Sequence, residues 1–245
     1  MRALILGGTS EGRELAALMS ARGWLVTSSL AGRVASPRLP VGEVRIGGFG
    51  GPAGLARWLI DQGVEVVVDA THPFAERISI SAAEATRATG VPLIALHRPA
   101  WEPVARDKWR MVDTMEEAAR ITERDYHHIL LTIGRQQLAS FAHDDLNLYV
   151  IRCVDEPDTP LPARHRVLLD RGPFTVAGEK KLMRDNQIDC VVTKNSGGEH
   201  TRPKLDAARE LGIHVVMLRR PHLPGGGRIT VVHTAEAAFN AAMEL

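Results

Sequence analysis

Short runs of β-branched and aliphatic residues alternate along most of the chain with stretches in which apolar residues recur every three or four positions. The short runs predict buried strands, and the periodic stretches predict helices with one apolar face. Regular alternation of the two is typical of a parallel sheet covered by helices, because each parallel crossover needs a long connection. The pattern therefore predicts an α/β fold.

The first half gives one complete series of such elements. We expect strands at residues 3–6, 24–29, 44–46, 64–69 and 92–96, and helices at residues 10–22, 52–62 and 74–89. Residues 97–103 contain two prolines and no periodicity, so we place a domain junction there. The first predicted domain is an α/β domain of residues 1–99.

A second series follows the junction. We expect strands at residues 129–133, 148–153, 167–169, 190–193 and 215–218, and helices at residues 115–124, 176–186, 203–211 and 235–243. We find no sequence repeat between the halves. The second predicted domain covers residues 100–245, and two such Rossmann-like sheets can face each other across a cleft at their strand ends.

Composition narrows the function classes. The 245 residues include 30 Lys and Arg against 29 Asp and Glu, a formal net charge of +1. This balance disfavours a dedicated nucleic-acid or membrane-surface binder, and no apolar run is long enough to span a membrane. Cys153 and Cys190 lie far apart without metal-ligand spacing, so we expect no metal, no disulfide and a reducing cytoplasm. Nothing in the sequence indicates an oligomeric state.

The first predicted strand leads into a glycine-bearing turn and then a helix, through the run Gly7-Gly8-Thr9-Ser10-Glu11-Gly12-Arg13. Backbone N–H groups at a helix N-terminus attract phosphate, and glycine lets a pyrophosphate approach the main chain. Thr9 replaces the middle glycine of the dinucleotide motif, and Glu11 would repel phosphate unless it points away or meets a ribose hydroxyl. The run predicts a dinucleotide site, and the alternative is a structural turn capped by Thr9 or Ser10.

The end of the second predicted strand bears on the choice of dinucleotide. The run Thr27-Ser28-Ser29-Leu30-Ala31-Gly32-Arg33 has no acid that would bind the ribose 2′-hydroxyl of NAD. Its hydroxyl groups, Ser28 among them, and the following Arg33 suit a 2′-phosphate instead, which favours NADP. The alternative interpretation makes Arg33 a solvated loop residue.

The fourth predicted strand ends in the run Asp69-Ala70-Thr71-His72-Pro73-Phe74-Ala75. Open α/β sheets bind ligands at this edge, so Thr71 is a candidate cofactor contact. His72 is a candidate proton donor, since its pKa lies near the working pH, or a hydrogen-bond donor to a substrate carboxylate. The alternative is a histidine that caps the Pro73 turn. We interpret Asp69 as a strand-end hydrogen-bond acceptor.

Three loops of the second half carry cations after predicted strands. They contain Thr193-Lys194-Asn195-Ser196-Gly197-Gly198, Gly134-Arg135-Gln136-Gln137 and Arg171-Gly172-Pro173-Phe174. Lysine, amide, hydroxyl and glycine form an anion-binding surface that suits carboxylates or the far side of a dinucleotide. Together the loops would make the cleft locally positive.

As a set, the turn that follows Leu6 and the runs that contain His72, Arg171 and Lys194 resemble the precorrin-6A reductase family of cobalamin biosynthesis. The resemblance runs nearly end to end. It implies NADPH-dependent reduction of one double bond of precorrin-6A, a tetrapyrrole, to give precorrin-6B in a cleft between two Rossmann-like domains. Related enzymes act on metal-free and on cobalt-containing rings, and the sequence does not separate the two.

The resemblance gives the candidate residues their roles. Cofactor phosphates would lie on residues 9–13, with Arg33 at the 2′-phosphate. The proton would come from His72, Lys194 or solvent. Substrate carboxylates would meet the following six residues: Arg135, Arg171, Lys194, Asn195, Ser196 and Gly197. Two alternatives remain, an NADP-dependent reductase of another polycarboxylate and a non-catalytic NADP-binding sensor.

Overall fold

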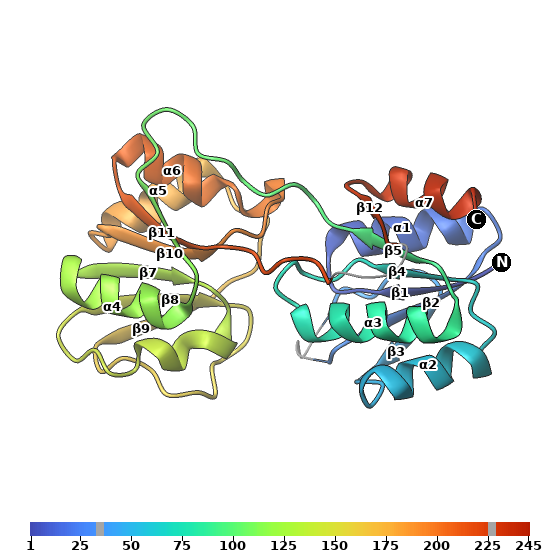
Figure 1. Cartoon of the computed structure of the whole chain (residues 1–245). Helices are drawn as coiled ribbons and strands as arrows, with labels where there is room; N and C mark the ends of the chain where they lie inside the picture. The colour runs from blue at the N-terminus through green and yellow to red at the C-terminus, as the bar shows by residue number, and fades with distance from the viewer. Residues whose placement is uncertain (33–36, 225–228) are drawn as a thin grey trace. The chain divides into compact units, whose positions relative to one another are not determined.

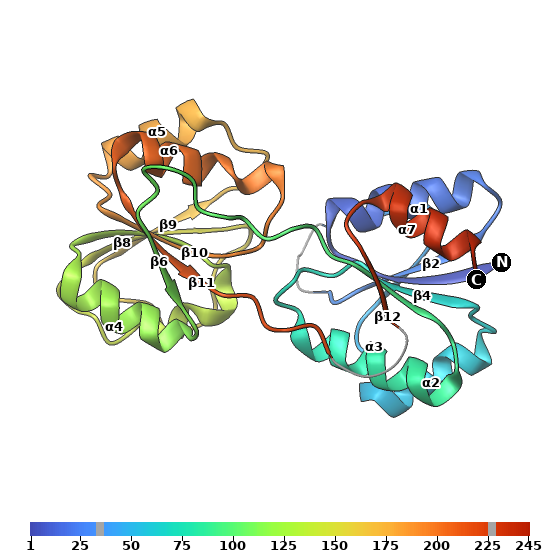
Figure 2. The ribbon, with the colours of Figure 1, turned by 45° about the horizontal axis from the view of Figure 1, so that its top comes forward.

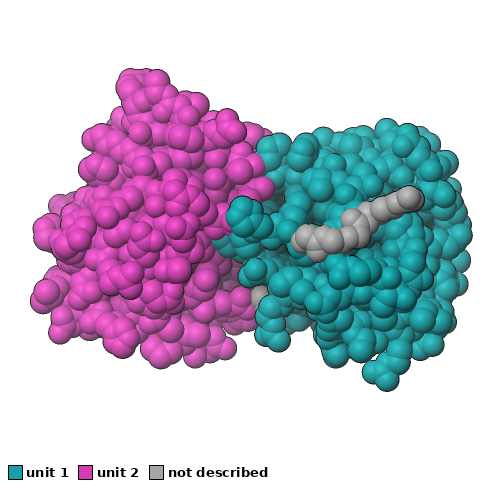
Figure 3. Space-filling model, viewed as in Figure 1, with its two compact units in different colours: residues 1–99, 221–245 teal, residues 100–220 magenta. Residues whose placement is uncertain are grey.

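The computed structural model describes residues 1–32, 37–224 and 229–245. Within these ranges, twelve strands form two six-stranded sheets in which every pairing is parallel. The chain divides into two compact units, coloured separately in Figure 3, with residues 1–99 and 221–245 in unit 1 and residues 100–220 in unit 2. The predicted α/β class with two parallel sheets is confirmed.

The sheet of unit 1 has the strand order β12-β5-β4-β1-β2-β3. Its strands are β1 (Arg2–Leu6), β2 (Leu25–Leu30), β3 (Glu43–Ile46), β4 (Val66–Asp69), β5 (Leu93–Leu96) and β12 (Ile229–Val232). Taken from β3 to β12, this is the 3-2-1-4-5-6 order of dinucleotide-binding folds. The order reverses between β1 and β4, and ligands bind at the carboxyl ends of the strands at such a switch point.

Helices cover both faces of this sheet (Figures 1 and 2), with α1 (Ser10–Ala21) and α7 (Ala235–Met243) on one face and α2 (Gly51–Asp61) and α3 (Glu76–Thr89) on the other. Alternate residues of β1 supply the two cores. Ile5 packs with Leu15 of α1, and Leu4 packs with Leu59 of α2. A strand buried on both faces has to be apolar throughout, which explains the uninterrupted hydrophobic run that begins the chain.

Unit 2 has the strand order β6-β11-β10-β7-β8-β9. Its strands are β6 (Trp109–Val112), β7 (His128–Thr132), β8 (Leu148–Cys153), β9 (His165–Leu169), β10 (Cys190–Lys194) and β11 (His214–Leu218). Its helices are α4 (Met115–Asp125), the 3₁₀ segment η1 (Arg135–Phe141), α5 (Val176–Asp185), the 3₁₀ turn η2 (Glu199–Thr201) and α6 (Pro203–Leu211). If β7 is numbered as the first strand, the sheet read from β9 to β11 again has the order 3-2-1-4-5, and β6 takes the sixth place.

In each sheet, the sixth strand comes from the segment that the chain forms just after it leaves the other unit. β6 follows β5 along the chain but pairs with β11, and β12 follows β11 but pairs with β5. The structure corrects the sequence analysis here, because neither strand was expected and residues 221–245 were assigned to the second domain. They belong to unit 1, since β12 extends its sheet and α7 packs against α1.

The topology also exposes a sequence repeat that the sequence analysis did not find. The two segments that contain β5 and β11 share the spacing Gly-x5-Leu-x-Arg-Pro, which begins at Gly90 and at Gly212. The strands β6 and β12 and their helices share Val-x-Thr-x-Glu-x-Ala. In both, the threonine (Thr114 or Thr234) caps the helix by accepting a backbone N–H.

Candidate functional site

The turn after β1 lies at the switch point of unit 1. Gly8 has φ of +122°, a conformation that favours glycine. The Thr9 hydroxyl donates to the carbonyl of Ala70, just beyond β4, over 2.7 Å, and accepts the Gly12 N–H over 3.1 Å. Thr9 therefore caps α1 and ties the ends of β1 and β4 together, and this cap uses only one of the N–H groups of the first turn.

The turn departs from the usual dinucleotide motif at Thr9, but at Gly12 it keeps the close helix–strand packing of that motif. A Cβ atom at Gly12 would lie 3.2 Å from Cβ of Ala70 and 3.4 Å from Oγ1 of Thr9. The third glycine of the motif serves this close approach of helix and strand. Thr9 takes the place of the middle glycine, and its side chain is bonded toward β4.

Glu11 in the first turn of α1 is neutralised by Arg98. One Arg98 nitrogen lies 3.0 and 3.1 Å from the two carboxylate oxygens, and the Ser10 hydroxyl donates over 3.0 Å. Burial opposes ionisation of Glu11, but the hydrogen bond from its own backbone N–H and the charge of Arg98 together lower its pKa. The predicted repulsion of phosphate by Glu11 is therefore offset by Arg98, a residue that the sequence analysis missed.

A buried aspartate organises the end of β4. Asp69 is 2% exposed and accepts the backbone N–H of Thr71 over 3.1 Å and its hydroxyl over 2.6 Å. The His97 ring nitrogen Nε2 lies 3.9 Å from the other oxygen. Burial alone would raise the pKa of Asp69, but the nearby side chains of His97 and Ser79 and the hydrogen bonds from Thr71 lower it. The Thr71 hydroxyl, predicted to contact the cofactor, thus donates to Asp69 here.

His72 lies exposed in the connection between β4 and α3. Its Nδ1 accepts the Phe74 N–H over 3.2 Å, so the neutral ring carries its proton on Nε2. This is the geometry of the capping interpretation, and it leaves an N–H donor on the ring. Its catalytic role stays a prediction.

The end of β2 combines a predicted residue with an unpredicted one. Ser28 is 1% exposed, and its hydroxyl has no hydrogen-bond partner in the described part of the chain. Arg33 lies outside the described residues. The neighbouring Ser29 hydroxyl accepts a hydrogen bond from Arg45 over 2.8 Å. Arg45 could have been predicted only from the register of β2 and β3, which pairs it with Ser29. The local sequence does not reveal that register.

The predicted cations of unit 2 follow three parallel strands. Arg135 begins η1 after β7, Arg171 lies two residues beyond β9, and Lys194 ends β10. Because the strands are parallel, the three loops leave from the same edge of the sheet, and β7 and β10 are neighbours. Arg135 donates to the Glu156 carbonyl over 3.4 Å, and Arg171 is exposed.

Asn195 and Ser196 shape the loop after β10 from within. The Asn195 amide accepts the Trp101 N–H over 2.8 Å and donates to the Trp101 carbonyl over 3.0 Å. The Asn195 carbonyl accepts from Arg220 over 2.6 Å. Asn195 and Ser196 are both buried, and Gly197 follows with φ of +63°. Asn195 therefore anchors the loop through its side chain.

An unpredicted ion pair supports the loop that contains Arg171. Arg152 of β8 donates to Glu179 of α5, and both side chains are more than nine-tenths buried. The Arg152 guanidinium lies 3.8 Å from the ring centroid of Phe174. A Cβ atom on Gly172 would meet that ring at 3.2 Å, so glycine gives the ring room to stack on the arginine.

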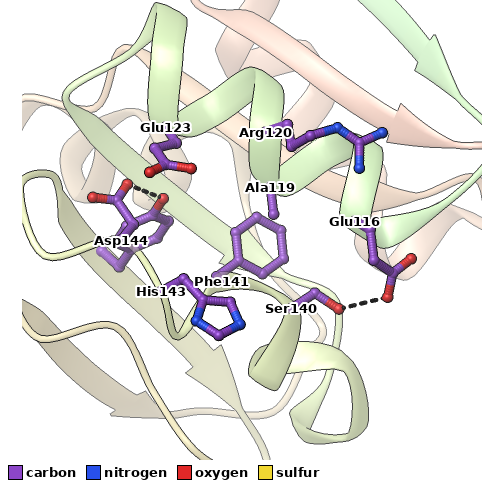
Figure 4. A pocket seen from close by; sticks show the side chains of 9 residues that line it. Glu116, Ala119, Arg120, Glu123, Ser140, Phe141, His143 and Asp144 are labelled. Atoms are coloured by element: carbon purple, nitrogen blue, oxygen red, sulfur yellow. Dashed lines mark hydrogen bonds between the residues drawn. The ribbon is translucent and has the colours of Figure 1, made fainter.

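A small pocket of about 200 Å³ lies between α4, η1 and β8 (Figure 4). In it the Ser140 hydroxyl donates to Glu116 over 3.1 Å, and the Tyr149 hydroxyl donates to Asp144 over 2.6 Å. Pockets for organic ligands start at about 300 Å³, and no predicted site residue lines this one. We interpret it as packing around Asp144.

Three further properties concern the described residues alone. No helix among them has the length and apolarity to cross a bilayer. No three His, Cys, Asp or Glu side chains in these ranges lie together as a metal site. Cys153 and Cys190 are buried thiols without a disulfide.

The sequence model of the family described as precorrin-6x reductase CbiJ/CobK matches residues 2–242. This chain belongs to that family. A precorrin-6A reductase of Rhodococcus erythropolis is 51% identical, with 91% of this chain and 90% of the relative covered. One of Mycobacterium tuberculosis is 48% identical over 96% and 95%. A solved structure described as CobK precorrin-6A reductase covers 100% of this chain and 96% of its own, with a TM-score of 0.92 and 39% identity.

Family membership confirms the resemblance drawn from the sequence motifs. The function class is that of a reductase of cobalamin biosynthesis that acts on a precorrin, and the two parallel sheets fit the Rossmann-like description.

Proposed function

We propose that this protein reduces one double bond of precorrin-6A with NADPH to give precorrin-6B, in the reducing cytoplasm that its cysteines predict. The observation that carries the proposal is the hydrogen bond from the Thr9 hydroxyl to the Ala70 carbonyl. It fixes the N-terminus of α1 at the switch point of a sheet with the order 3-2-1-4-5-6. Diphosphates of dinucleotides bind at this place in such folds. The identity of the proposed substrate is taken from the relatives named precorrin-6A reductase.

The residues of unit 1 fit a dinucleotide. Apart from Gly8 and its chain neighbours, no described heavy atom lies within 4 Å of where a Gly8 side chain would begin, so the main chain is open to a close approach there. The run Gly8-Thr9-Ser10-Glu11-Gly12-Arg13 holds the diphosphate, Thr71 lies beside it across the switch point, and Ser28 and Arg33 hold the adenosine end. When bound, NADPH supplies the hydride.

The cationic loops of unit 2 bind the acetate and propionate groups of the macrocycle. Arg135, Arg171 and Lys194 each extend from a different strand end, which suits carboxylates spread around a ring. Asn195 fixes the main chain next to Lys194 through its two hydrogen bonds to Trp101, and Ser196 and Gly197 continue the same substrate-binding loop. Orientation of the substrate then follows from several weak contacts rather than one pocket.

His72 and Lys194 are the two protein groups proposed to donate the proton. His72 offers the Nε2–H that its cap on Phe74 leaves on the ring, and Lys194 offers an ammonium group at a strand end. The variants His72→Gln and Lys194→Met separate them. The variant that lacks the proton donor should have a much lower kcat that no longer depends on pH. The other variant should keep the wild-type kcat and its pH dependence.

The deciding experiment follows nicotinamide and macrocycle absorbance together after the purified protein is mixed with precorrin-6A and NADPH. We expect nicotinamide absorbance to fall as the macrocycle spectrum shifts, one cofactor for each ring. Binding without oxidation would overturn the proposal in favour of an NADP sensor. Oxidation by a different polycarboxylate and not by precorrin-6A would assign another substrate.

A further inference from the structure

Arg45 of β3 is held rigidly at the end of β2. Its Nη1 donates to the Ser29 hydroxyl over 2.8 Å and to the Gly47 carbonyl over 3.0 Å, and its Nη2 donates to the Gly48 carbonyl over 3.0 Å. Its guanidinium carbon lies 3.7 Å from the ring centroid of Phe49. Three hydrogen bonds and a stacked ring leave the guanidinium little freedom to move.

Arg45 carries a charge that has no ion-pair partner among the residues that the structure describes. Among the described residues no carboxylate forms an ion pair with it, and the nearby acid of β3, Glu43, accepts from Thr27 instead. Burial lowers the pKa of the guanidinium, so this cation is partly removed from water without an anion. Binding of an anion therefore stabilises a half-buried, unpaired cation of this kind.

The remaining donors of Arg45 define what that anion looks like. Three of the five N–H groups are used, and the Nε hydrogen and one Nη2 hydrogen donate to no described protein atom. Nε and Nη2 share one edge of the planar group, and this edge can bind carboxylate or phosphate through two parallel hydrogen bonds. The free edge therefore fits an oxyanion.

We propose that Arg45 binds the 2′-phosphate of NADPH and sets the preference for NADPH over NADH. This inference rests on the proposed function, because it requires a dinucleotide on the turn after β1. In folds of this strand order the end of β2 meets the ribose 2′ position, and Ser29 is the penultimate residue of β2. Ser29 and the two glycine carbonyls orient the guanidinium, and the phosphate takes its free edge.

The test compares the dissociation constants of NADPH and NADH for the full chain. Arg45→Ala should weaken NADPH binding by about 10- to 100-fold and change NADH binding by less than about twofold. Arg45→Lys keeps the charge but not the paired donors, so it should fall between wild type and Arg45→Ala. Arg57→Ala, which removes an exposed arginine from α2, is the matched control and should leave both constants unchanged.

The outcomes separate this inference from the function on which it rests. Retained NADH binding shows that the Arg45 variants are folded. If Arg45→Ala keeps the wild-type ratio of the two constants, the inference is overturned while the proposed function stands, and Arg33→Ala in the same assay then tests the residue predicted from sequence. If wild-type protein binds neither dinucleotide, both proposals fail.

Discussion

The two units share a strand order but differ in the connection that follows their central strand. In unit 1, β1 leads through Gly8 into α1, a helix of 12 residues. In unit 2, β7 leads through Gly134 into η1, a 3₁₀ segment of 7 residues. An α-helix concentrates about half a positive charge at its N-terminus, whereas a short 3₁₀ segment aligns fewer and less regular peptide dipoles.

Unit 2 compensates with side chains where unit 1 uses main chain. Its strand-end loops carry Arg135, Arg171 and Lys194, while the corresponding turn of unit 1 neutralises its one acid, Glu11, with Arg98. A diphosphate is small and suits fixed amides, but the carboxylates of a macrocycle are widely spread and suit long cationic side chains. Under the proposed function, the difference would let one architecture serve twice, for a cofactor in unit 1 and for a substrate in unit 2.

The largest expected effect comes from Gly8, in the connection between β1 and α1 of unit 1. Gly8→Ala should raise the Michaelis constant for NADPH by about 10- to 100-fold, because a side chain at φ of +122° is strained and shifts the turn. The steady-state assay with precorrin-6A at saturation measures it.

Gly134→Ala is the matched control in unit 2. Gly134 has φ of +74°. Chain neighbours aside, no described heavy atom lies within 4 Å of the Cβ added at either glycine, so both variants introduce backbone strain without a clash. Both should lower the free energy of unfolding by about 1–3 kcal/mol. Only Gly8→Ala should affect NADPH, and equal effects of the two on NADPH would remove the distinction between the units.

The fold could be predicted from sequence wherever strands are buried on both faces. Runs such as the one that forms β1 are apolar throughout, and the turn after β1 carries its own signal in Gly8, Thr9 and Gly12. Strands β6 and β12 escaped because each is a four-residue edge strand with partly exposed residues. Their partners are distant in sequence, so no local pattern indicates the pairing.

The candidate site divides in the same way. Loops that follow predicted strands could be located from sequence, because parallel strands bring their carboxyl ends to one edge. Arg45 and Arg98 could not, since each acts on a residue brought near by pairing or by the path of the chain between units. Asn195 was located correctly in its loop, but its bond to Trp101 spans 94 residues and leaves no trace in the local sequence.

A smaller effect is expected from the ion pair that conditions the turn of unit 1. Arg98→Ala should weaken NADPH binding by about 10-fold, because it leaves the Glu11 carboxylate uncompensated beside the phosphates. Glu11→Gln in the Arg98→Ala background should restore binding to within about threefold. Calorimetric titration of the two single variants and the double variant completes the cycle. Without rescue in the double variant, Arg98 would contact the cofactor itself.

In unit 2 the corresponding change should affect the other ligand. Lys194→Met removes the ammonium group and keeps the length of the side chain, and we expect the Michaelis constant for precorrin-6A to rise by about fivefold. The constant for NADPH should stay unchanged. Lys181→Met, which removes an exposed lysine from α5, is the control. A rise in the NADPH constant instead would place cofactor phosphates on unit 2 and reverse the assignment.

The smallest effect concerns acid stability at the switch point of unit 1. The pKa of Asp69 lies below its usual 3.8 despite burial, because the nearby side chains of His97 and Ser79 and the hydrogen bonds from Thr71 favour the carboxylate. A lowered pKa in the folded state contributes stability that is present above pH 3.8 and is lost as the pH falls through the folded-state value. Asp69→Asn should therefore lower the melting temperature by a few degrees at pH 7, and its deficit against wild type should shrink as thermal melts are repeated toward pH 3. Asp145→Asn, at an exposed aspartate of unit 2, should follow the wild-type curve throughout. A deficit for Asp69→Asn that stays constant with pH would mean that the side chain stabilises unit 1 by packing rather than by charge.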